Sequence, residues 1–345
     1  MKNQGVTLLI RRESNPPNPY HSSWVDWIDA PPPTRLEVYL EKVNKVLSRS
    51  DSPDMGIRWG LNPYRGCTHA CAYCYARPYH QYLDWGAGTD FERKIVVRTN
   101  AAEKLRETLC KKTWHKQMIS ISGITDCYQP LEGHYEITKQ CLQACLEFHN
   151  PVGIMTKGAL VVRDAELLAR LHHSAPKTTV GFSVAFSDDE MSKKIEPGTP
   201  RPSVRLRAMK VLHEAGVPVF VSIAPVIPGL NDDQIAEILE RAHAAGARRA
   251  IMIMLRLPGE VKDVFLSRVG EQFPLRLQRI VNNIKTMRDG KLYNSEFGKR
   301  FKGEGEKWEM IEALFNLTCK KLGMNARIHS PNTAPPPKPE QLGLF

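Results

Sequence analysis

Short apolar runs alternate with longer stretches of helical spacing between residues 59 and 257. The short runs are rich in β-branched residues and predict strands, at Met118–Thr125, Val152–Thr156, Thr179–Val184, Val217–Ile223 and Ala250–Met254. The stretches between them predict helices, at Ala101–Lys111, Tyr135–Phe148, Asp164–His172, Ser203–Glu214 and Asp232–Ala244. Strict alternation of strand and helix favours parallel strands joined by right-handed crossovers.

This regular alternation indicates the fold class. One further strand before Cys67 brings the number of β/α units to about six, fewer than the eight of a closed barrel. We therefore predict an α/β protein whose core, residues 59–257, is a partial (β/α)6 TIM-type barrel.

The segments that flank this core show other patterns. Residues 1–58 are predicted to form an N-terminal arm, in which the amphipathic segment Leu36–Leu47 predicts a helix. The alternation stops after Pro258, and a basic helical extension is predicted over residues 258–330, with helices at Val261–Met287 and Lys307–Leu322. Residues 331–345 are rich in proline and predict an extended tail.

Three cysteines lie in one short segment after the first expected strand. Cys67, Cys71 and Cys74 form a C-x3-C-x2-C motif, which can hold three corners of a 4Fe-4S cluster and leave the fourth iron open to a ligand. A zinc site is the alternative, with His69 or His80 as a further ligand. Zinc motifs usually supply a second cysteine pair at a distance, and the sequence has none at such a spacing.

The residues around these cysteines resemble the radical SAM superfamily, and within it the DNA-repair-photolyase-like branch that includes spore photoproduct lyase. The resemblance extends from about Ser52 to Leu257. It is carried by the cysteine motif and by five segments, Asn62–Cys67, Asp90–Glu92, Thr125–Glu132, Thr156–Gly158 and Ala224–Asn231. It implies that the cluster reduces S-adenosylmethionine (SAM) and cleaves it to a 5'-deoxyadenosyl radical, with a reducing electron donor such as flavodoxin or ferredoxin.

The resemblance also implies cofactor contacts at the carboxyl ends of the strands, where parallel barrels place their working residues. It assigns SAM contacts to Thr125, Lys157 and Ser183, and it places Tyr73 and Tyr75 near the adenine or the cluster. The Lys157 ammonium suits the methionine carboxylate, and the hydroxyl groups suit ribose or carboxylate oxygens. The alternatives are strand-end hydrogen bonds for the two hydroxyl residues and an exposed loop charge for the lysine.

Two neighbouring residues are candidates for the reaction itself. Asp126 either orients the cofactor or substrate or caps the following helix. Spore photoproduct lyase returns a hydrogen atom to its product through a cysteine, and the resemblance places that cysteine at the position of Gly123. This departure leaves Cys127 as the nearby candidate for a hydrogen donor, with a buried packing thiol as the alternative.

Charge adds a class of partner. The net charge is +11, and residues 268–327 contain 13 Lys or Arg against 7 Asp or Glu, a net +6. Aromatic residues are interleaved with these Lys and Arg residues, a mixture that suits the binding of phosphate backbones and the stacking of nucleobases. We therefore predict a nucleic-acid partner, with DNA favoured over RNA; a solvated helical surface is the alternative reading.

Location follows from what the sequence lacks. No apolar stretch approaches the ~18 residues that cross a bilayer, and the run Val6–Ile10 is too short for a signal-peptide core. These features predict a cytoplasmic protein without a membrane partner, whose eight cysteines are thiols or cluster ligands.

The last five residues contain a second partner motif. Gln341, Leu342, Leu344 and Phe345 resemble the short peptide with which replication and repair proteins bind the bacterial sliding clamp. Gly343 departs from the serine or aspartate usual in that peptide, and a chance match is the alternative.

These observations lead to one function hypothesis and two alternatives. The hypothesis is a radical SAM enzyme that acts on nucleic acid, by DNA repair or base modification with a lyase-like reaction. The alternatives are a radical SAM enzyme for a protein or small molecule, and a non-catalytic nucleic-acid-binding module that a cluster or zinc stabilises. SAM cleavage that requires a reduced cluster separates the enzymes from the module, and salt-sensitive nucleic-acid binding separates the two enzymes.

Overall fold

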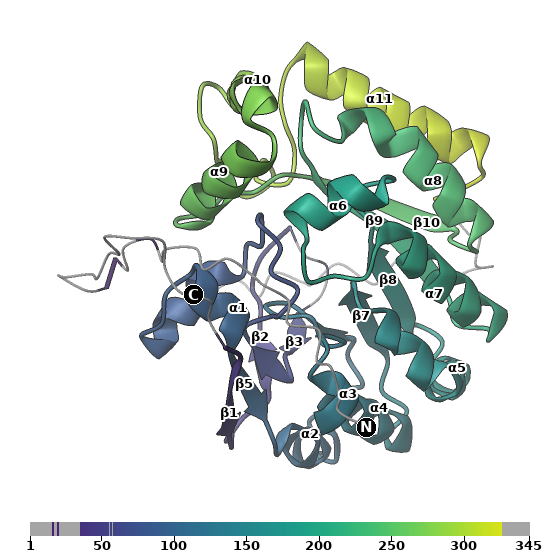
Figure 1. Cartoon of the computed structure of the whole chain (residues 1–345). Coiled ribbons are helices and arrows are strands. Elements are labelled where there is room, and N and C mark those ends of the chain that lie inside the picture. Colours follow the sequence, from purple (N-terminus) through teal and green to yellow (C-terminus); the bar gives the residue numbers. More distant parts are fainter. Residues whose placement is uncertain (1–15, 17–18, 21–34, 55, 57, 326–345) are drawn as a thin grey trace, which may run out of the picture.

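Parallel strands form the centre of the molecule (Figure 1). The computed structural model describes residues 16, 19–20, 35–54, 56 and 58–325 of the 345-residue chain. The main sheet has the order β10-β9-β8-β7-β6-β3-β2. Its parallel strands are β3 (Trp59–Leu61), β6 (Ile119–Ile121), β7 (Val152–Thr156), β8 (Thr179–Ser183), β9 (Val219–Val226) and β10 (Arg249–Met254). A short strand, β2 (Leu47–Arg49), pairs antiparallel with β3 and ends the sheet.

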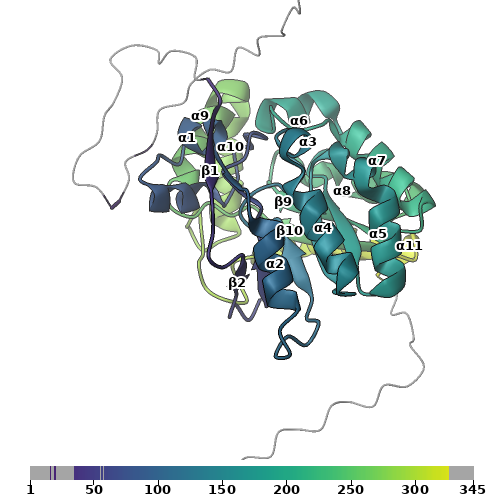
Figure 2. The ribbon, with the colours of Figure 1, turned by 90° about the horizontal axis from the view of Figure 1, so that it is seen from below.

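Within the main sheet, each parallel strand pairs with the next parallel strand along the chain, and a helix forms the crossover between the two. The connecting helices are α2 (Ala101–Leu109), α4 (Ile137–Glu147), α5 (Ala165–Ser174), α7 (Pro202–Glu214) and α8 (Ile235–Ala244). Helices α4, α5 and α7 form a layer outside the strands in both ribbon views (Figures 1 and 2). The outermost described strands, β10 and β2, do not pair with each other. The predicted α/β fold with an open, partial barrel is therefore confirmed.

Apolar residues at helical spacing attach these helices to the sheet. In α4, Cys141, Leu142 and Cys145 are fully buried in the main core, so the two thiols pack as apolar groups. Shorter helical segments occupy the connections, namely η1 (Arg77–Leu83), α1 (Thr89–Arg93), α3 (Glu132–Tyr135), η2 (Ala159–Asp164), α6 (Asp189–Ile195) and η3 (Asp232–Gln234).

The predicted helix at Leu36–Leu47 is wrong. The segment forms β1 (Glu37–Glu41) and then leads into β2, and β1 pairs in parallel with β5 (Lys94–Arg98) in a second sheet that also contains β4 (Tyr64–Arg65). Its first half also alternates with a period of two, and pairing with the edge of β5 selects this period over the helical one.

The strand predicted at Met118–Thr125 is shorter than expected. It ends at Ile121, and Ser122 has a φ of +86° that takes the chain out of the extended conformation. The Asn62 side chain then accepts hydrogen bonds from the backbone N–H groups of Gly123 and Ile124, at 2.8 and 2.9 Å. Thr125 and Asp126 consequently lie in a loop beyond the strand end.

The described part of the C-terminal extension, up to residue 325, contains three helices rather than two. The pattern at Val261–Met287 is divided into α9 (Val261–Gln272) and α10 (Pro274–Thr286), because Pro274 has no backbone N–H to continue α9 and starts a new helix. The third helix, α11 (Glu306–Lys321), packs on α8 (Figure 1).

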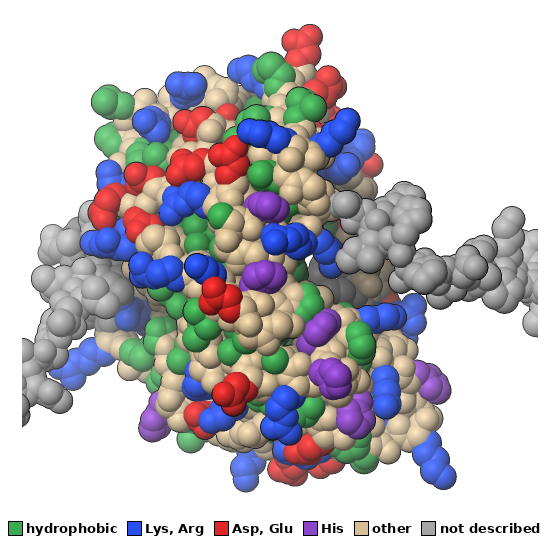
Figure 3. Space-filling model, turned by 90° about the vertical axis from the view of Figure 1, so that its right-hand side faces the viewer, with side chains coloured by type: hydrophobic (Ala, Val, Ile, Leu, Met, Phe, Trp, Pro, Cys, Tyr) green, Lys and Arg blue, Asp and Glu red, His purple; other side chains and the backbone are tan. Residues whose placement is uncertain are grey.

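The outer helical face carries charges of both signs. Acidic and basic side chains are interspersed over α5, α7 and α8 (Figure 3). Several of them form ion pairs, such as Arg241 with Glu237 and Lys210 with Glu214. This face therefore does not account for the basic excess of the chain.

The predicted clamp-binding motif lies wholly outside the described residues, and the predicted absence of a membrane span can be examined only within them. The clamp-like motif at residues 341–345 is outside them and stays a prediction. In the described part of the chain, no helix combines the length and the apolarity needed to traverse a bilayer.

Candidate active site

The three motif cysteines lie in one loop between β4 and η1. Cys67 and Cys71 are each 6% exposed and Cys74 is half-buried, and all three are free thiols. Gly66 precedes them with a φ of +75°, and a Cβ at this position would lie 2.8 Å from the carbonyl oxygen of Phe91. Glycine is required at this turn because any other side chain would meet the backbone.

Two arginines fix the backbone of this loop. Arg77 is fully buried and donates to the carbonyl of Cys71 at 2.8 Å, and Arg268 of α9 donates to the carbonyl of Ala70. Both guanidinium groups also pair with the carboxylate of Glu92 in α1. A shared carboxylate thus balances the two buried charges and joins the C-terminal extension to the cysteine loop. Sequence reasoning missed this arrangement, although Glu92 lies in one of the segments that carry the resemblance.

The loop after β6 braces the cysteine loop from another side. The Thr125 hydroxyl donates to the carbonyl of Gly66 at 2.6 Å, and the Gln129 side chain accepts from the backbone N–H of Thr68 at 3.0 Å. The amide nitrogen of Gln129 donates to Oγ1 of Thr125 at 3.2 Å. The Thr125 hydroxyl therefore already has a structural hydrogen bond. This agrees with the alternative to a SAM contact that the sequence leaves open for this residue.

Asp126 lies at the centre of a buried hydrogen-bond network. Its carboxylate accepts from the Thr156 hydroxyl at 2.6 Å and from the backbone N–H of Lys157 at 2.7 Å, and it lies 3.3 Å from Nδ1 of His69. Burial disfavours the charged form, but His69 and these hydrogen bonds outweigh burial and hold the Asp126 pKa below its usual range. The next helix, α3, has Leu131 at its N-cap, so Asp126 does not cap it.

Lys157 directly follows β7 and lies over the ring of Tyr73. Its Nζ is 5.4 Å from the ring centroid, within the range of a cation–π contact. The Tyr73 hydroxyl donates to the carboxylate of Glu196, which also pairs with Arg205. Both members of the Glu196–Arg205 pair are fully buried.

The segment after α6 packs directly on the cysteine loop. The backbone N–H of Gly198 donates to the carbonyl of His69 at 3.1 Å. A Cβ on Gly198 would lie 2.2 Å from the carbonyl oxygen of Thr68, so a larger residue would displace the loop.

The remaining predicted residues are less closely grouped. Tyr75 is 43% exposed, and its hydroxyl donates to the carbonyl of Gly123 at 2.5 Å. The Ser183 hydroxyl donates to the carbonyl of Ala224 at 3.1 Å, at the end of β8. Cys127 is 0% exposed in the main core. The structure thus brings Thr125, Asp126 and Lys157 against the cysteine loop, which itself contains Tyr73. Among the described residues, no hydrogen bond or ion pair joins the side chain of Ser183 or Cys127 to that loop.

The donor set fits an iron–sulfur cluster. Burial raises the pKa of all three motif thiols, and for Cys71 to about 12, so they hold their protons until a metal supplies positive charge. Among the described residues, no three His, Cys, Asp or Glu side chains are arranged around the position of a single ion. A cubane cluster binds each cysteine through a separate iron and does not need such an arrangement.

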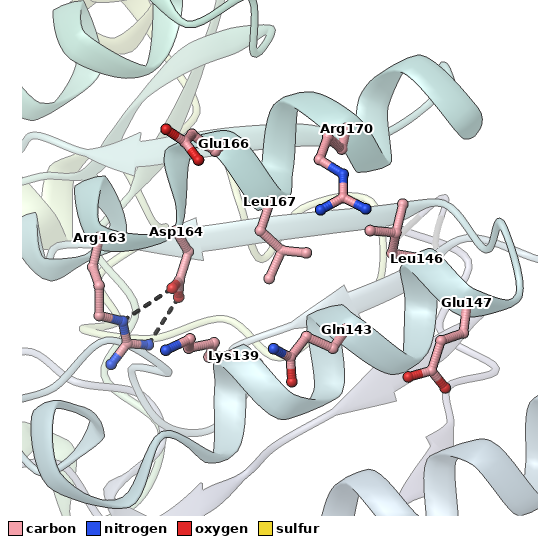
Figure 4. A pocket seen from close by; sticks show the side chains of 9 residues that line it. All are labelled: Lys139, Gln143, Leu146, Glu147, Arg163, Asp164, Glu166, Leu167 and Arg170. Atoms are coloured by element: carbon pink, nitrogen blue, oxygen red, sulfur yellow. Dashed lines mark hydrogen bonds and ion pairs between the residues drawn. The ribbon is translucent and has the colours of Figure 1, made fainter.

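A surface pocket between α4 and α5 does not belong to this site (Figure 4). It lies in the outer helical layer, and its charged side chains are largely paired. Arg163 binds Asp164 at 2.8 Å, and Glu147 binds Arg106 at 2.7 Å. These pairs leave little free charge to bind a ligand.

Comparison with known proteins gives a family and a fold. The family model described as the radical SAM superfamily matches residues 61–242. An uncharacterized protein of Mycobacterium tuberculosis (strain ATCC 25618 / H37Rv) is 36% identical over 239 residues, 69% of each chain. An uncharacterized protein of Methanocaldococcus jannaschii is 30% identical over 202 residues, 58% of this chain and 71% of its own.

Solved structures extend the likeness in fold beyond the matched region. Spore photoproduct lyase complexed with dinucleoside spore photoproduct aligns with a TM-score of 0.60 and 16% identity, and the alignment covers 83% of this chain and 80% of the lyase. A lyase mutant with bound AdoMet and the same dinucleoside aligns with a TM-score of 0.58 and 18% identity.

Proposed function

Because this chain belongs to the radical SAM superfamily, we propose that it binds a 4Fe-4S cluster through Cys67, Cys71 and Cys74 and cleaves SAM reductively to modify or repair DNA. The observation that carries the proposal is the cysteine loop itself, which presents three free thiols on a backbone held by Arg77 and Arg268. A rigid loop of this kind preorganises the ligands of a cluster.

The surrounding residues provide the binding functions that such a site needs. When bound, the cluster would supply the electron that cleaves SAM. Lys157 is half-buried and its ammonium has no carboxylate partner in the described chain, so it is free to bind the SAM carboxylate. Asp126 stays ionised and fixes the backbone of Lys157 and the ring of His69. Tyr73 and Tyr75 offer rings beside the cysteines, and the hydroxyl groups of Thr125 and Ser183 remain candidates for cofactor oxygens.

Two observations support DNA as the substrate class. The solved lyase structures with the same fold hold a dinucleoside spore photoproduct, and residues 268–327 in the extension beside the site carry a net charge of +6 out of +11 for the chain. The proposed reaction is therefore lyase-like chemistry on a damaged or modified base. An electron donor such as flavodoxin or ferredoxin would complete the system.

The hydrogen donor is a separate question. Cys127 is the thiol nearest to Asp126 in sequence, but its full burial in the core favours the packing alternative. Cys127→Ala separates the two roles, because loss of a donor alters the product or raises SAM cleavage without product, whereas loss of packing lowers stability only.

Anaerobic reconstitution tests the cluster and the cofactor site. We expect about four irons per chain and 5'-deoxyadenosine after addition of dithionite and SAM, and loss of both when the three cysteines are replaced by alanine. Lys157→Ala should weaken SAM binding about tenfold or more in equilibrium dialysis, whereas Lys177→Ala, an exposed lysine before β8, should not. Iron retained by the triple variant, or equal SAM affinity in both lysine variants, contradicts the respective assignment.

Deuterated SAM and damaged oligonucleotides test the substrate. Transfer of deuterium to DNA would support the proposal. Full SAM cleavage without any interaction with DNA or RNA would instead favour a protein or small-molecule substrate.

A further inference from the structure

Two arginines, Arg256 beside the cysteine loop and Arg288 near Arg256, lie without an acidic partner in the described structure. Arg256 follows β10 at the carboxyl edge of the sheet, and Arg288 follows α10. Arg288 is 4% exposed, and its Nε and Nη1 have no hydrogen-bond partner among the described residues. Nε of Arg256 is also buried and without a hydrogen-bond partner there. Buried guanidinium groups are unfavourable without a counter-charge, so this arrangement is suited to an anion that binds between them.

The electrostatics agree with this geometry. Burial lowers the pKa of Arg288 to about 10, and the nearby positive charge of Arg256 acts in the same direction. A guanidinium remains charged under these conditions, since even a pKa of about 10 is far above neutral pH. An anion between the two groups would relieve both the repulsion and the desolvation.

Aromatic rings hold Arg256 in position next to the cysteines. Its guanidinium carbon lies 5.4 Å from the ring centroid of Tyr75 and 5.0 Å from that of Phe301, and Nη2 donates to the Tyr293 hydroxyl at 3.4 Å. Tyr75 directly follows the ligand Cys74. The stacked guanidinium therefore lies beside the place where a substrate would meet the cofactor.

A third arginine provides an internal contrast. Arg300 stacks on the same Phe301 ring at 4.8 Å, but it pairs with Asp54 at 2.6 Å and donates to the Ser52 hydroxyl at 2.5 Å. Its charge is balanced within the protein, as expected of a structural arginine. Arg256 and Arg288 differ because the described residues place no carboxylate beside them.

We propose that Arg256 and Arg288 bind a phosphate group of the substrate backbone beside Tyr75. Guanidinium groups bind phosphate through paired, charge-assisted hydrogen bonds, which suits the free donors of these two residues. Exposed Lys291 and Lys302, with Phe297 at 56% exposure, extend the positive surface outward as a path for a longer polyanion. The inference rests on the proposed nucleic-acid substrate and assigns the contact that would orient it.

Titration of the reconstituted full-length protein with a fluorescent single-stranded oligonucleotide tests this site. Arg288→Met and Arg256→Met should each lower the affinity about tenfold and reduce the salt dependence by about one phosphate contact. Lys210→Met removes the same charge from α7, away from this edge, and should leave the affinity unchanged. Equal affinity in all three variants would overturn the proposal.

Thermal unfolding gives a readout that needs no nucleic acid. Inorganic phosphate should raise the Tm of the wild type more than that of Arg288→Met, because ligand binding to the folded state stabilises it. Without phosphate, Arg288→Met should have a Tm at or above that of the wild type, since the substitution removes an unpaired buried charge. An equal effect of phosphate on both proteins contradicts the site even if the variant is folded and stable.

The same variants show whether the bound anion is the SAM carboxylate or a nucleic-acid phosphate. They also separate the proposed arginine site from the proposed nucleic-acid substrate. If Arg288→Met loses affinity for SAM but not for the oligonucleotide, the ligand is the SAM carboxylate and the phosphate assignment is wrong. If the wild type binds phosphate through Arg288 but no oligonucleotide, the site stands and the nucleic-acid proposal fails.

Discussion

Two buried carboxylates beside the cysteine loop, Glu92 and Glu196, are paired with arginines, and these arginines also donate to backbone carbonyls. Glu196 receives hydrogen bonds from Tyr73, Ser192 and Arg205 in an environment without solvent. Burial raises the Glu196 pKa and Arg205 opposes the shift, so the carboxylate depends on its arginine. At the scale of the residue, the site is therefore stabilised by buried carboxylates that each need an arginine partner.

Breaking the pair at Glu196 should be costly. Glu196→Gln leaves the Arg205 guanidinium buried without a counter-charge, and we expect a loss of about 3 kcal/mol in the free energy of unfolding. Urea denaturation measures this loss. Glu190→Gln is the matched control, because its pair with Arg201 is exposed and contributes about 0–1 kcal/mol. Similar losses in the two variants would contradict the role given to the buried pair.

His80 should make the protein sensitive to acid. It is buried against Trp85 and Phe91, and burial lowers its pKa from 6.5 to about 4. As the pH falls below 6.5 the unfolded state binds the proton first, so stability is complete above pH 6.5 and is lost down to about pH 4. At pH 5 the loss from this group is about 2 kcal/mol.

Replacement of His80 isolates this contribution. The difference in unfolding free energy between pH 7.5 and pH 5 should be smaller in His80→Phe than in the wild type. His115→Phe, which replaces an exposed histidine, should retain the wild-type difference. An unchanged difference in His80→Phe would exclude His80 as the acid-sensitive group.

At the scale of the element, the spacing of apolar residues predicted those helices and strands whose formation depends mainly on their own sequence. Strand β7 and helix α4 each bury an apolar face of regular period, and both lie where the sequence predicts them. Segment Leu36–Leu47 carries two periods, so the choice depended on β5, a partner more than 50 residues away. Arg268 was not predicted at the site because its contact with Ala70 spans 198 residues and leaves no local signal.

Helix α9 should stabilise the cluster-binding loop through Arg268. Arg268→Met removes the hydrogen bond to Ala70 and one of the two charges on Glu92, so we expect faster loss of iron from the reconstituted protein, by about tenfold. Iron release to a chelator measures the rate. Arg276→Met in α10 is the control and should behave as the wild type.

At the scale of the whole molecule, the barrel and the extension meet at the cysteine loop, whereas the clamp-like motif lies outside the described residues. We expect a chain that ends at residue 340 to retain SAM cleavage and to lose binding to a purified bacterial sliding clamp. Surface plasmon resonance against immobilised clamp checks the second expectation. Equal binding by both chains, or by neither, would remove the clamp from the set of partners.

The contact between Arg268 and Ala70 also sets an order for biosynthesis. The three cysteines leave the ribosome long before Arg268, which follows Ala70 by 198 residues. At roughly 5–20 residues per second, this interval lasts roughly 10–40 s. During that time the nascent thiols lack the helix that will hold their loop, so we expect stable insertion of iron to follow the synthesis of α9 rather than that of the cysteines.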